Sequence, residues 1–199
     1  GLGRRHVVDL LASFGSDSCM VNDSDRMEAT PFCFVTGSGH QYFLDTVRQL
    51  IEQVTPERIE SALANDLPPS DEKFSMRWDP SEDRRYALMW NDPTASGNKT
   101  MTNWAINLLA YQGLQLLPST PSTRGLRSTG WTNGKEPSWS WPIWVSPLGM
   151  DLIRTILIRT DSEKQPARIG IEAIYRAYRL QVGNPPLHKI NFSPAERIS

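Results

Sequence analysis

Residues 74–118 read FSMRWDPSEDRRYALMWNDPTASGNKTMTNWAINLLAYQGLQLLP and combine aromatic rings, arginines and an apolar helical pattern. It contains Trp78, Trp90 and Trp104, and all seven tryptophans of the chain lie between Trp78 and Trp144. Large aromatic side chains dominate the energetics of protein cores, so this middle third is expected to supply the core. Arginines set among such rings are also suited to contacts with phosphates and bases.

The same segment predicts two kinds of secondary structure. Asp-Pro pairs at residues 79–80 and 92–93 predict turns. Between them, residues 85–90 alternate in character, which favours a half-buried strand over a helix. Residues 103–117 give the clearest helical pattern of the chain, with apolar side chains around most of the circumference, as in a buried core helix.

The flanking sequence predicts further helices at residues 4–14, 40–54, 55–65 and 146–158. Strands are predicted at residues 31–36, 139–145 and 168–182, the second as an edge strand because it contains a proline. Residues 119–138 contain almost no acids and are predicted to be a long loop. The fold class predicted is α+β, with a mixed, mostly antiparallel sheet, packed helices and long functional loops.

Length and composition are those of one ordinary globular domain. The 199 residues are 39% hydrophobic and 22% charged, which suffices for a sizeable core. We therefore expect a single domain over residues 1–199. Within it, an acidic helical part at residues 1–70 precedes an aromatic and basic part at residues 71–199.

Several classes of protein are disfavoured by composition. No apolar run approaches the length of a membrane span, and the N-terminal residues lack the apolar region of a signal peptide. The two cysteines, Cys19 and Cys33, are too few for a disulfide framework or a metal cluster. We therefore expect a cytoplasmic protein with no membrane partner.

The net charge of −1 conceals an uneven distribution. Residues 1–100 carry 10 Lys and Arg against 16 Asp and Glu, whereas residues 101–199 carry 11 against 6. A subunit that contacts protein with one half and phosphate with the other has this distribution. Chance patterning of surface charge is the alternative interpretation.

Catalytic signatures are weak. His6, His40 and His188 lack metal-ligand spacing, and the glycines of residues 37–39 match no nucleotide-binding fingerprint, so a plain strand-to-helix turn is the default there. Three clustered carboxylates could serve a metal-dependent nuclease: Asp79, Asp83 and Asp92. Capping of turns and neutralisation of nearby arginines explain these acids more simply. We expect no enzyme activity and no cofactor.

Binding of a polyanion is the remaining hypothesis. Basic residues fall into three groups, each near aromatic side chains or in an acid-poor stretch: Arg77, Arg84, Arg85 and Lys99; Arg124, Arg127 and Lys135; Arg176, Arg179 and Lys189. In the first two groups, Arg84, Arg85, Arg124, Arg127 and Lys135 are predicted to contact phosphates. Contacts to bases or RNA are predicted for Asn103, Arg176 and Arg179.

Motifs along most of the chain occur in a familiar order: FVTGSGHQYFLDTVRQLI (34–51), RWDPSEDRRYALMWNDPT (77–94), the helix of residues 103–118, STGW (128–131), WPIWVSPLGMDLIRTIL (141–157) and YRAYRLQVGNPPLHKINFSPAERI (175–198). In this order they resemble the large-subunit-type proteins of type I CRISPR effector complexes, particularly subtype I-G (formerly I-U). The resemblance rests on these motifs and not on a catalytic signature.

The resemblance implies one subunit of a Cascade-like ribonucleoprotein of antiviral defence. Large subunits lie near the 5′ end of the guide RNA, help to recognise the protospacer-adjacent motif (PAM), and help to recruit the helicase-nuclease; they are not nucleases themselves. The partners implied are CRISPR guide RNA, target double-stranded DNA, the other effector-complex subunits and the helicase-nuclease. Sequence specificity would come from guide pairing. The chain is short for a full large subunit, so we expect a truncated form or one module.

A second alternative is a subunit of a complex that makes no contact with nucleic acid. The acidic N-terminal half would dock on protein, and the chain would be a purely structural partner in its complex. The cations of residues 119–138 separate this hypothesis from nucleic-acid binding, because only the latter requires them to hold phosphate.

Overall fold

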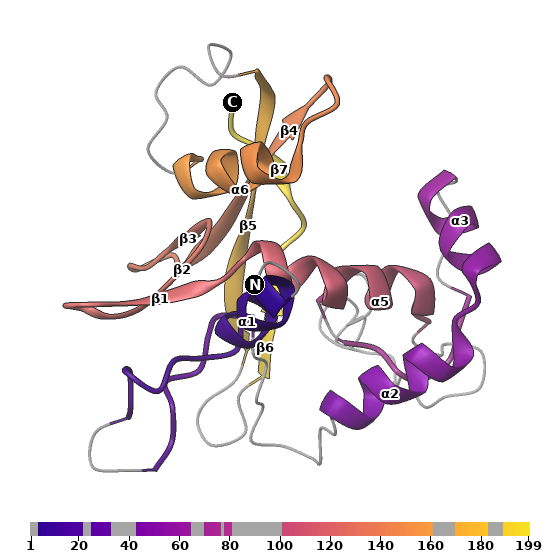
Figure 1. Ribbon diagram of the computed structural model, residues 1–199, viewed down its shortest axis with the longest axis horizontal. Coiled ribbons are helices and arrows are strands. Elements are labelled where there is room, and N and C mark those ends of the chain that lie inside the picture. The colour runs from indigo at the N-terminus through magenta and orange to yellow at the C-terminus, as the bar shows by residue number, and fades with distance from the viewer. Residues whose placement is uncertain are drawn as a thin grey trace. The chain divides into compact units, whose positions relative to one another are not determined.

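The structure of the protein is a computed structural model, which describes residues 4–21, 25–32, 43–64, 70–76, 78–80, 101–160, 170–182 and 189–199. Helices and antiparallel strand pairs occupy separate stretches of the chain (Figure 1). Every strand register described is antiparallel. The predicted α+β class is therefore confirmed.

The helical elements are α1 (Arg5–Ala12), α2 (Phe43–Gln53), α3 (Pro56–Ala64), α5 (Trp104–Gly113), the 3-10 helix η3 (Leu114–Leu116) and α6 (Met150–Arg159). The strands are β1 (Ser119–Ser122), β2 (Gly125–Ser128), β3 (Trp131–Thr132), β4 (Ser138–Trp144), β5 (Ile171–Val182), β6 (Lys189–Phe192) and β7 (Glu196–Arg197). The predicted helices and the strand at 168–182 are confirmed as elements where the chain is described, but α6 begins at Met150, with Gly149 as its N-cap, and not at residue 146 as predicted. The strand predicted at 85–90 lies outside the described residues, as does most of that at 31–36.

The long loop predicted at residues 119–138 is wrong, because this stretch contains β1, β2 and β3. Its Ser, Thr and Pro content conceals a hairpin whose β2 residues alternate, with Leu126 and Ser128 buried and Arg127 exposed. Gly125, at φ +96°, adopts the left-handed backbone conformation that begins the return strand. The hairpin is therefore specified by one glycine and by alternation too short to stand out in the sequence.

The predicted edge position of β4 is also wrong, since β4 lies between β3 and β5 in a sheet ordered β3-β4-β5-β6, with β7 paired to β5. The short β3 flanks only Ser138 and Trp139. Pro142 lies beyond these pairs, opposite Ile174 of β5. The proline is therefore tolerated in an inner strand because β3 ends before reaching it.

A bulge in the β4–β5 pairing connects the sheet to α6. The register shifts between Ile143 and Trp144 of β4. Ile171 and Ile174 of β5 pack in one buried cluster with Ile156 of α6, although a regular strand would direct residues three apart to opposite faces. The bulge thus allows both isoleucines to reach the helix.

The chain divides into two compact units. Unit 1 comprises Gly1–Phe34, Gly113–Arg179 and Ser193–Ser199, and unit 2 comprises Val35–Gln112 and Leu180–Phe192. The expectation of one domain over residues 1–199 stays a prediction.

Unit 2 has a core of α2 and α5 that is capped by one carboxylate. Val47, Leu50 and Leu108 are buried together, with aromatic rings packed around them. Asp71 accepts a hydrogen bond from the backbone N–H of Trp104 at the start of α5 (2.9 Å) and from the Arg58 guanidinium (2.6 Å to Oδ2). A carboxylate at this helix end satisfies an N–H that the helix leaves unpaired.

In unit 1, the turn before β3 makes a close approach that only glycine permits. Gly130 has φ +70°, and its carbonyl accepts a hydrogen bond from the N–H of Ser140 at 2.8 Å. A Cβ at Gly130 would lie 2.6 Å from the Ser140 carbonyl oxygen and 2.9 Å from Nε1 of Trp139. The turn that follows hairpin β1–β2 is thereby held against β4.

We expect Gly130→Ala to lower the free energy of unfolding by about 1–3 kcal/mol, because both the positive φ and the contact with β4 oppose a side chain. Denaturant unfolding followed by circular dichroism measures the change. Gly113→Ala is the matched control: Gly113 is α-helical, and its Cβ would meet nothing within 4 Å. The control should be neutral or stabilising by up to about 1 kcal/mol. Equal stability of the two variants would contradict the account of Gly130.

Candidate nucleic-acid interface

The predicted cations fall into described and undescribed parts of the chain. Arg77, Arg84, Arg85 and Lys99 lie outside the described residues, and Lys189 lies on β6 with its side chain outside them. Arg124, Arg127 and Lys135 lie in or beside the hairpins β1–β2 and β3–β4. Arg176 and Arg179 lie on β5. The candidate interface is therefore built on the hairpins.

Hairpin β1–β2 presents Arg124 at its tip. Ser122 pairs with Gly125, so Thr123 and Arg124 form the connecting loop. The Ser122 hydroxyl donates to the Gly125 carbonyl (2.7 Å) and accepts from the backbone N–H of Arg124 (3.2 Å). These bonds fix the backbone of the loop, while the Arg124 side chain is exposed.

A carboxylate far away in the sequence anchors this hairpin. Oε2 of Glu28 accepts a hydrogen bond from the backbone N–H of Leu126 at 3.0 Å, across 98 positions of sequence. A Cβ at Gly125 would lie 3.0 Å from the same oxygen. At the other end of the hairpin, the buried hydroxyls of Ser119 and Ser128 lie 2.6 Å apart. The hairpin is thus held at both ends.

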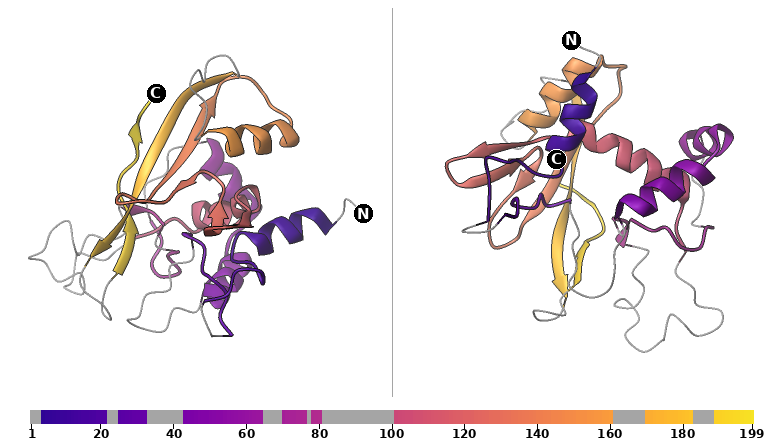
Figure 2. Two further views of the ribbon diagram at one scale, coloured as in Figure 1. Left: turned by 90° about the vertical axis from the view of Figure 1, so that its left-hand side faces the viewer. Right: turned by 60° about the horizontal axis from the view of Figure 1, so that its bottom comes forward.

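Arg124, Arg127 and Lys135 form what we call the hairpin cations. All three side chains are exposed, and none makes an ion pair or side-chain hydrogen bond with any described residue. The loop of β1–β2 and the β3–β4 turn that contains Lys135 project on the same side of unit 1 (Figures 1 and 2). By contrast, Arg48 on α2 already pairs with Asp45 and Glu52, which raise the pKa of its guanidinium.

One of the hairpin cations lines a cavity of about 300 Å³, which we call the hairpin cavity. Its walls come from the hairpin, the following turn and the end of α6: Pro118, Thr120, Arg127, Ser128, Thr129, Gly130 and Ile158. Sequence reasoning identified Arg127 but missed the other walls. The STGW turn, with its glycine before a tryptophan, was the available signal for Gly130; nothing local indicates that Ile158 lies nearby.

A row of stacked rings covers one face of the sheet. Trp141 stacks on Trp139, with centroids 4.5 Å apart, and on Tyr175 across the β4–β5 pair, at 6.2 Å. Phe32 meets Trp139 edge to face at 5.5 Å. Because the rings stack on one another, a base could stack only at the Tyr175 end of the row. The row serves packing more than base recognition.

The residues predicted to contact bases also have internal partners. Nε of Arg176 donates to the Ser140 hydroxyl at 3.2 Å, and Arg179 is half-buried on β5. Oδ1 of Asn103 accepts from the backbone N–H of Ile106 at 3.1 Å, as an N-terminal cap of α5 does. Contact of these three side chains with nucleic acid stays a prediction.

Of the three carboxylates of the nuclease alternative, only Asp79 lies among the described residues. Asp79 is exposed, whereas Asp83 and Asp92 lie outside the described residues. Within the described ranges, no group of three His, Cys, Asp or Glu side chains could hold a metal ion. The nuclease alternative stays a prediction.

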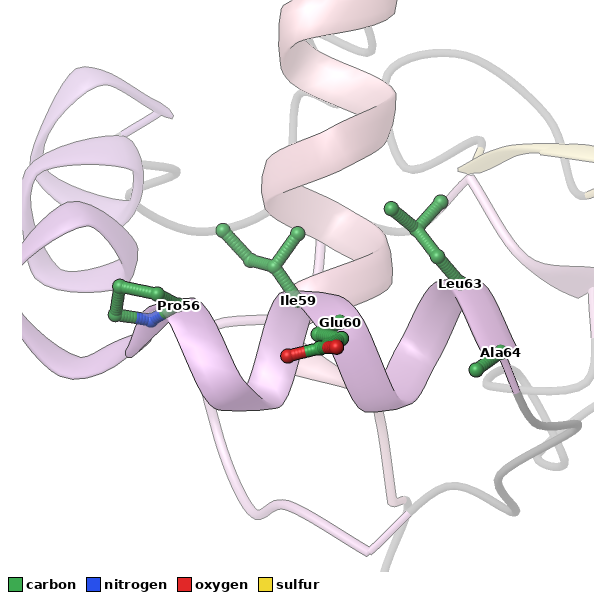
Figure 3. Close-up of a pocket in the computed structure, with 5 residues that line it drawn as sticks. All are labelled: Pro56, Ile59, Glu60, Leu63 and Ala64. Atoms are coloured by element: carbon green, nitrogen blue, oxygen red, sulfur yellow. The ribbon is translucent and has the colours of Figure 1, made fainter.

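A second hollow, on α3 in unit 2, has a different character. Pro56, Ile59, Glu60, Leu63 and Ala64 line about 480 Å³ of open space, and Ile59 and Leu63 point to the same side of the helix (Figure 3). At the start of α3, a hydrogen bond with the Thr55 hydroxyl lowers the pKa of Glu57, as contacts at a capped helix N-terminus do. None of the described residues that line this hollow is a cation. It therefore does not suit phosphate.

Comparison of the chain with protein-family models, with curated proteins and with solved structures finds no match to any of them. Of the helices that the structure describes, none is long and apolar enough to cross a membrane.

We expect Glu28→Ala to accelerate hydrogen exchange at the Leu126 amide and to lower the free energy of unfolding by about 1–3 kcal/mol, since a partly buried donor loses its acceptor. Exchange monitored by NMR measures the first effect and denaturant unfolding the second. Glu28→Gln keeps a carbonyl acceptor and should lose less of both. Unchanged exchange at Leu126 in Glu28→Ala would refute the anchoring role.

Proposed function

We propose that this protein binds a nucleic-acid strand through its phosphates, using Arg124, Arg127 and Lys135, and does not cleave it. The observation that carries the proposal is the set of hairpin cations, which are exposed on the two hairpins β1–β2 and β3–β4 and make no internal ion pair among the described residues. Cations that are not neutralised internally remain available to phosphates, and their binding releases the counterions of the strand.

The proposed contacts are to backbone and carry little sequence information. Phosphate contacts position a protein on a strand, whereas base contacts specify sequence. The rings that could have read bases are stacked on one another, from Trp139 to Tyr175. Binding with little sequence preference is therefore the expected behaviour of this surface.

Outside the short PAM, which the protein reads itself, weak sequence preference is what an RNA-guided complex requires of its protein parts, because guide pairing reads the sequence. We therefore extend the proposal to a large-subunit-like role in a CRISPR effector complex, with guide RNA and target double-stranded DNA as ligands and PAM recognition and recruitment of the helicase-nuclease as tasks. The motif order of the sequence supports this extension. The net charge of −1 fits a chain that needs neighbouring subunits for affinity.

Replacing all three hairpin cations by Gln should weaken binding of a fluorescein-labelled single-stranded oligonucleotide and flatten its salt dependence. Each phosphate contact contributes about 0.7 to the slope of log K against log salt for single strands, so the slope should fall by about 2. Fluorescence anisotropy over a series of salt concentrations measures both quantities.

Arg48→Gln is the control for the loss of a single positive charge, to be compared with Arg124→Gln. Arg48 already pairs with Asp45 and Glu52. Its loss should leave the slope unchanged, whereas Arg124→Gln should lower it. If the triple variant retains both affinity and slope, the hairpins hold no phosphate and the purely structural role takes its place.

Membership of an RNA-guided complex has its own test. Affinity purification of the protein from its native source, followed by RNA sequencing, should recover short RNAs derived from repeats. Recovery of protein partners without such RNAs would contradict this part of the proposal while leaving phosphate binding by the isolated chain intact.

A further inference from the structure

The hairpin cavity has the size of a site for one small ligand. Its volume of about 300 Å³ lies at the lower end of the range for small-molecule sites, which is about 300–1,000 Å³. All its walls belong to unit 1. A single nucleotide suits such a volume, whereas a longer stretch of strand does not.

The charge of the cavity favours an anion. Among the described residues that line it, Arg127 is the only ionisable one and none is a carboxylate. Thr120 lies directly opposite Arg127 in the β1–β2 register, so the two side chains share a face of the hairpin. The Thr120 hydroxyl has no hydrogen-bond partner among the described residues. A guanidinium beside a free hydroxyl can hold two oxygens of one phosphate group.

Another part of the cavity is apolar. Ile158, in the last turn of α6, is 61% exposed, and Pro118 is the other ring or aliphatic side chain that lines the cavity among the described residues. Inorganic phosphate would leave Ile158 uncovered, and an apolar ligand would leave Arg127 without a counter-charge. A ligand with a phosphate at one end and a flat, less polar body at the other covers both.

We propose that the hairpin cavity binds a nucleoside monophosphate group, with the phosphate on Arg127 and Thr120 and the nucleoside against Ile158 and Pro118. The group is either a free nucleotide or the 5′-terminal nucleotide of a strand. A terminal phosphate carries nearly two negative charges at pH 7, against one for an internal phosphodiester, which favours the end of a strand. This inference and the proposed function have Arg127 in common, and the inference rests on the proposed function in that respect alone.

Titration of the full 199-residue chain with AMP, adenosine and inorganic phosphate, followed by isothermal calorimetry, tests the site. AMP should bind, with adenosine and phosphate each at least about tenfold weaker. Arg127→Gln should weaken AMP by about tenfold or more, since it removes a charge-assisted bond. Arg124→Gln is the matched control, because Arg124 lies on the same hairpin but outside the cavity, and it should leave AMP binding unchanged.

A second variant tests the apolar wall. Ile158→Ala should weaken AMP severalfold and leave inorganic phosphate unchanged, because it removes only the surface against which the nucleoside packs. Arg127 and Ile158 are both exposed, so we expect both variants to fold. Circular dichroism checks this.

Oligonucleotides with a 5′-phosphate or a 5′-hydroxyl distinguish the two sources. A preference for the 5′-phosphate that disappears in Arg127→Gln assigns the cavity to a strand end, whereas AMP binding without such a preference assigns it to a free nucleotide. Absence of AMP binding below about 1 mM together with equal affinity for both oligonucleotides overturns the inference. If oligonucleotide binding then still depends on Arg124 and Lys135, the proposed function survives that failure.

Discussion

The antiparallel pairing of β4 with β5 is the contact on which unit 1 depends. Its register places Trp141 beside Tyr175 and Ser140 beside Arg176, so one face of the sheet is aromatic and the other has polar pairs. The bulge near Trp144 allows β5 to reach α6 through two isoleucines. The N–H of Ser140 also bonds the carbonyl of Gly130, so the same strand fixes the turn that connects hairpin β1–β2 to the sheet.

An isolated two-stranded hairpin is marginally stable in water, so the position of the hairpin cations depends on what holds β1 and β2. Glu28 bonds the N–H of Leu126, the hydroxyls of Ser119 and Ser128 close the opposite end, and Gly130 fixes the exit. Arg124 and Arg127 are therefore presented by an anchored element. Fixed cations lose less conformational entropy on meeting a strand than cations on a free loop.

The aromatic rings and the cations of unit 1 have different roles. Trp139, Trp141 and Tyr175 stack on one another, whereas the hairpin cations make no ion pair with any described residue. A sequence in which arginine and tryptophan alternate therefore does not by itself predict base recognition, because it does not show whether the ring faces are available for stacking on a base. The result is a surface suited to phosphate and poorly suited to reading bases.

The sequence by itself determined the α+β class, the helices and strand β5, because hydrophobic periodicity and turn residues are local properties. It also identified Arg124, Arg127 and Lys135 as an acid-poor group. Only the tertiary structure decided that residues 119–138 are paired strands, that β4 is flanked on both sides, and that Ile158 and Arg127 share a cavity. Pairing register and the approach of distant segments depend on contacts such as that of Glu28 with Leu126, which lie 98 positions apart and leave no local pattern.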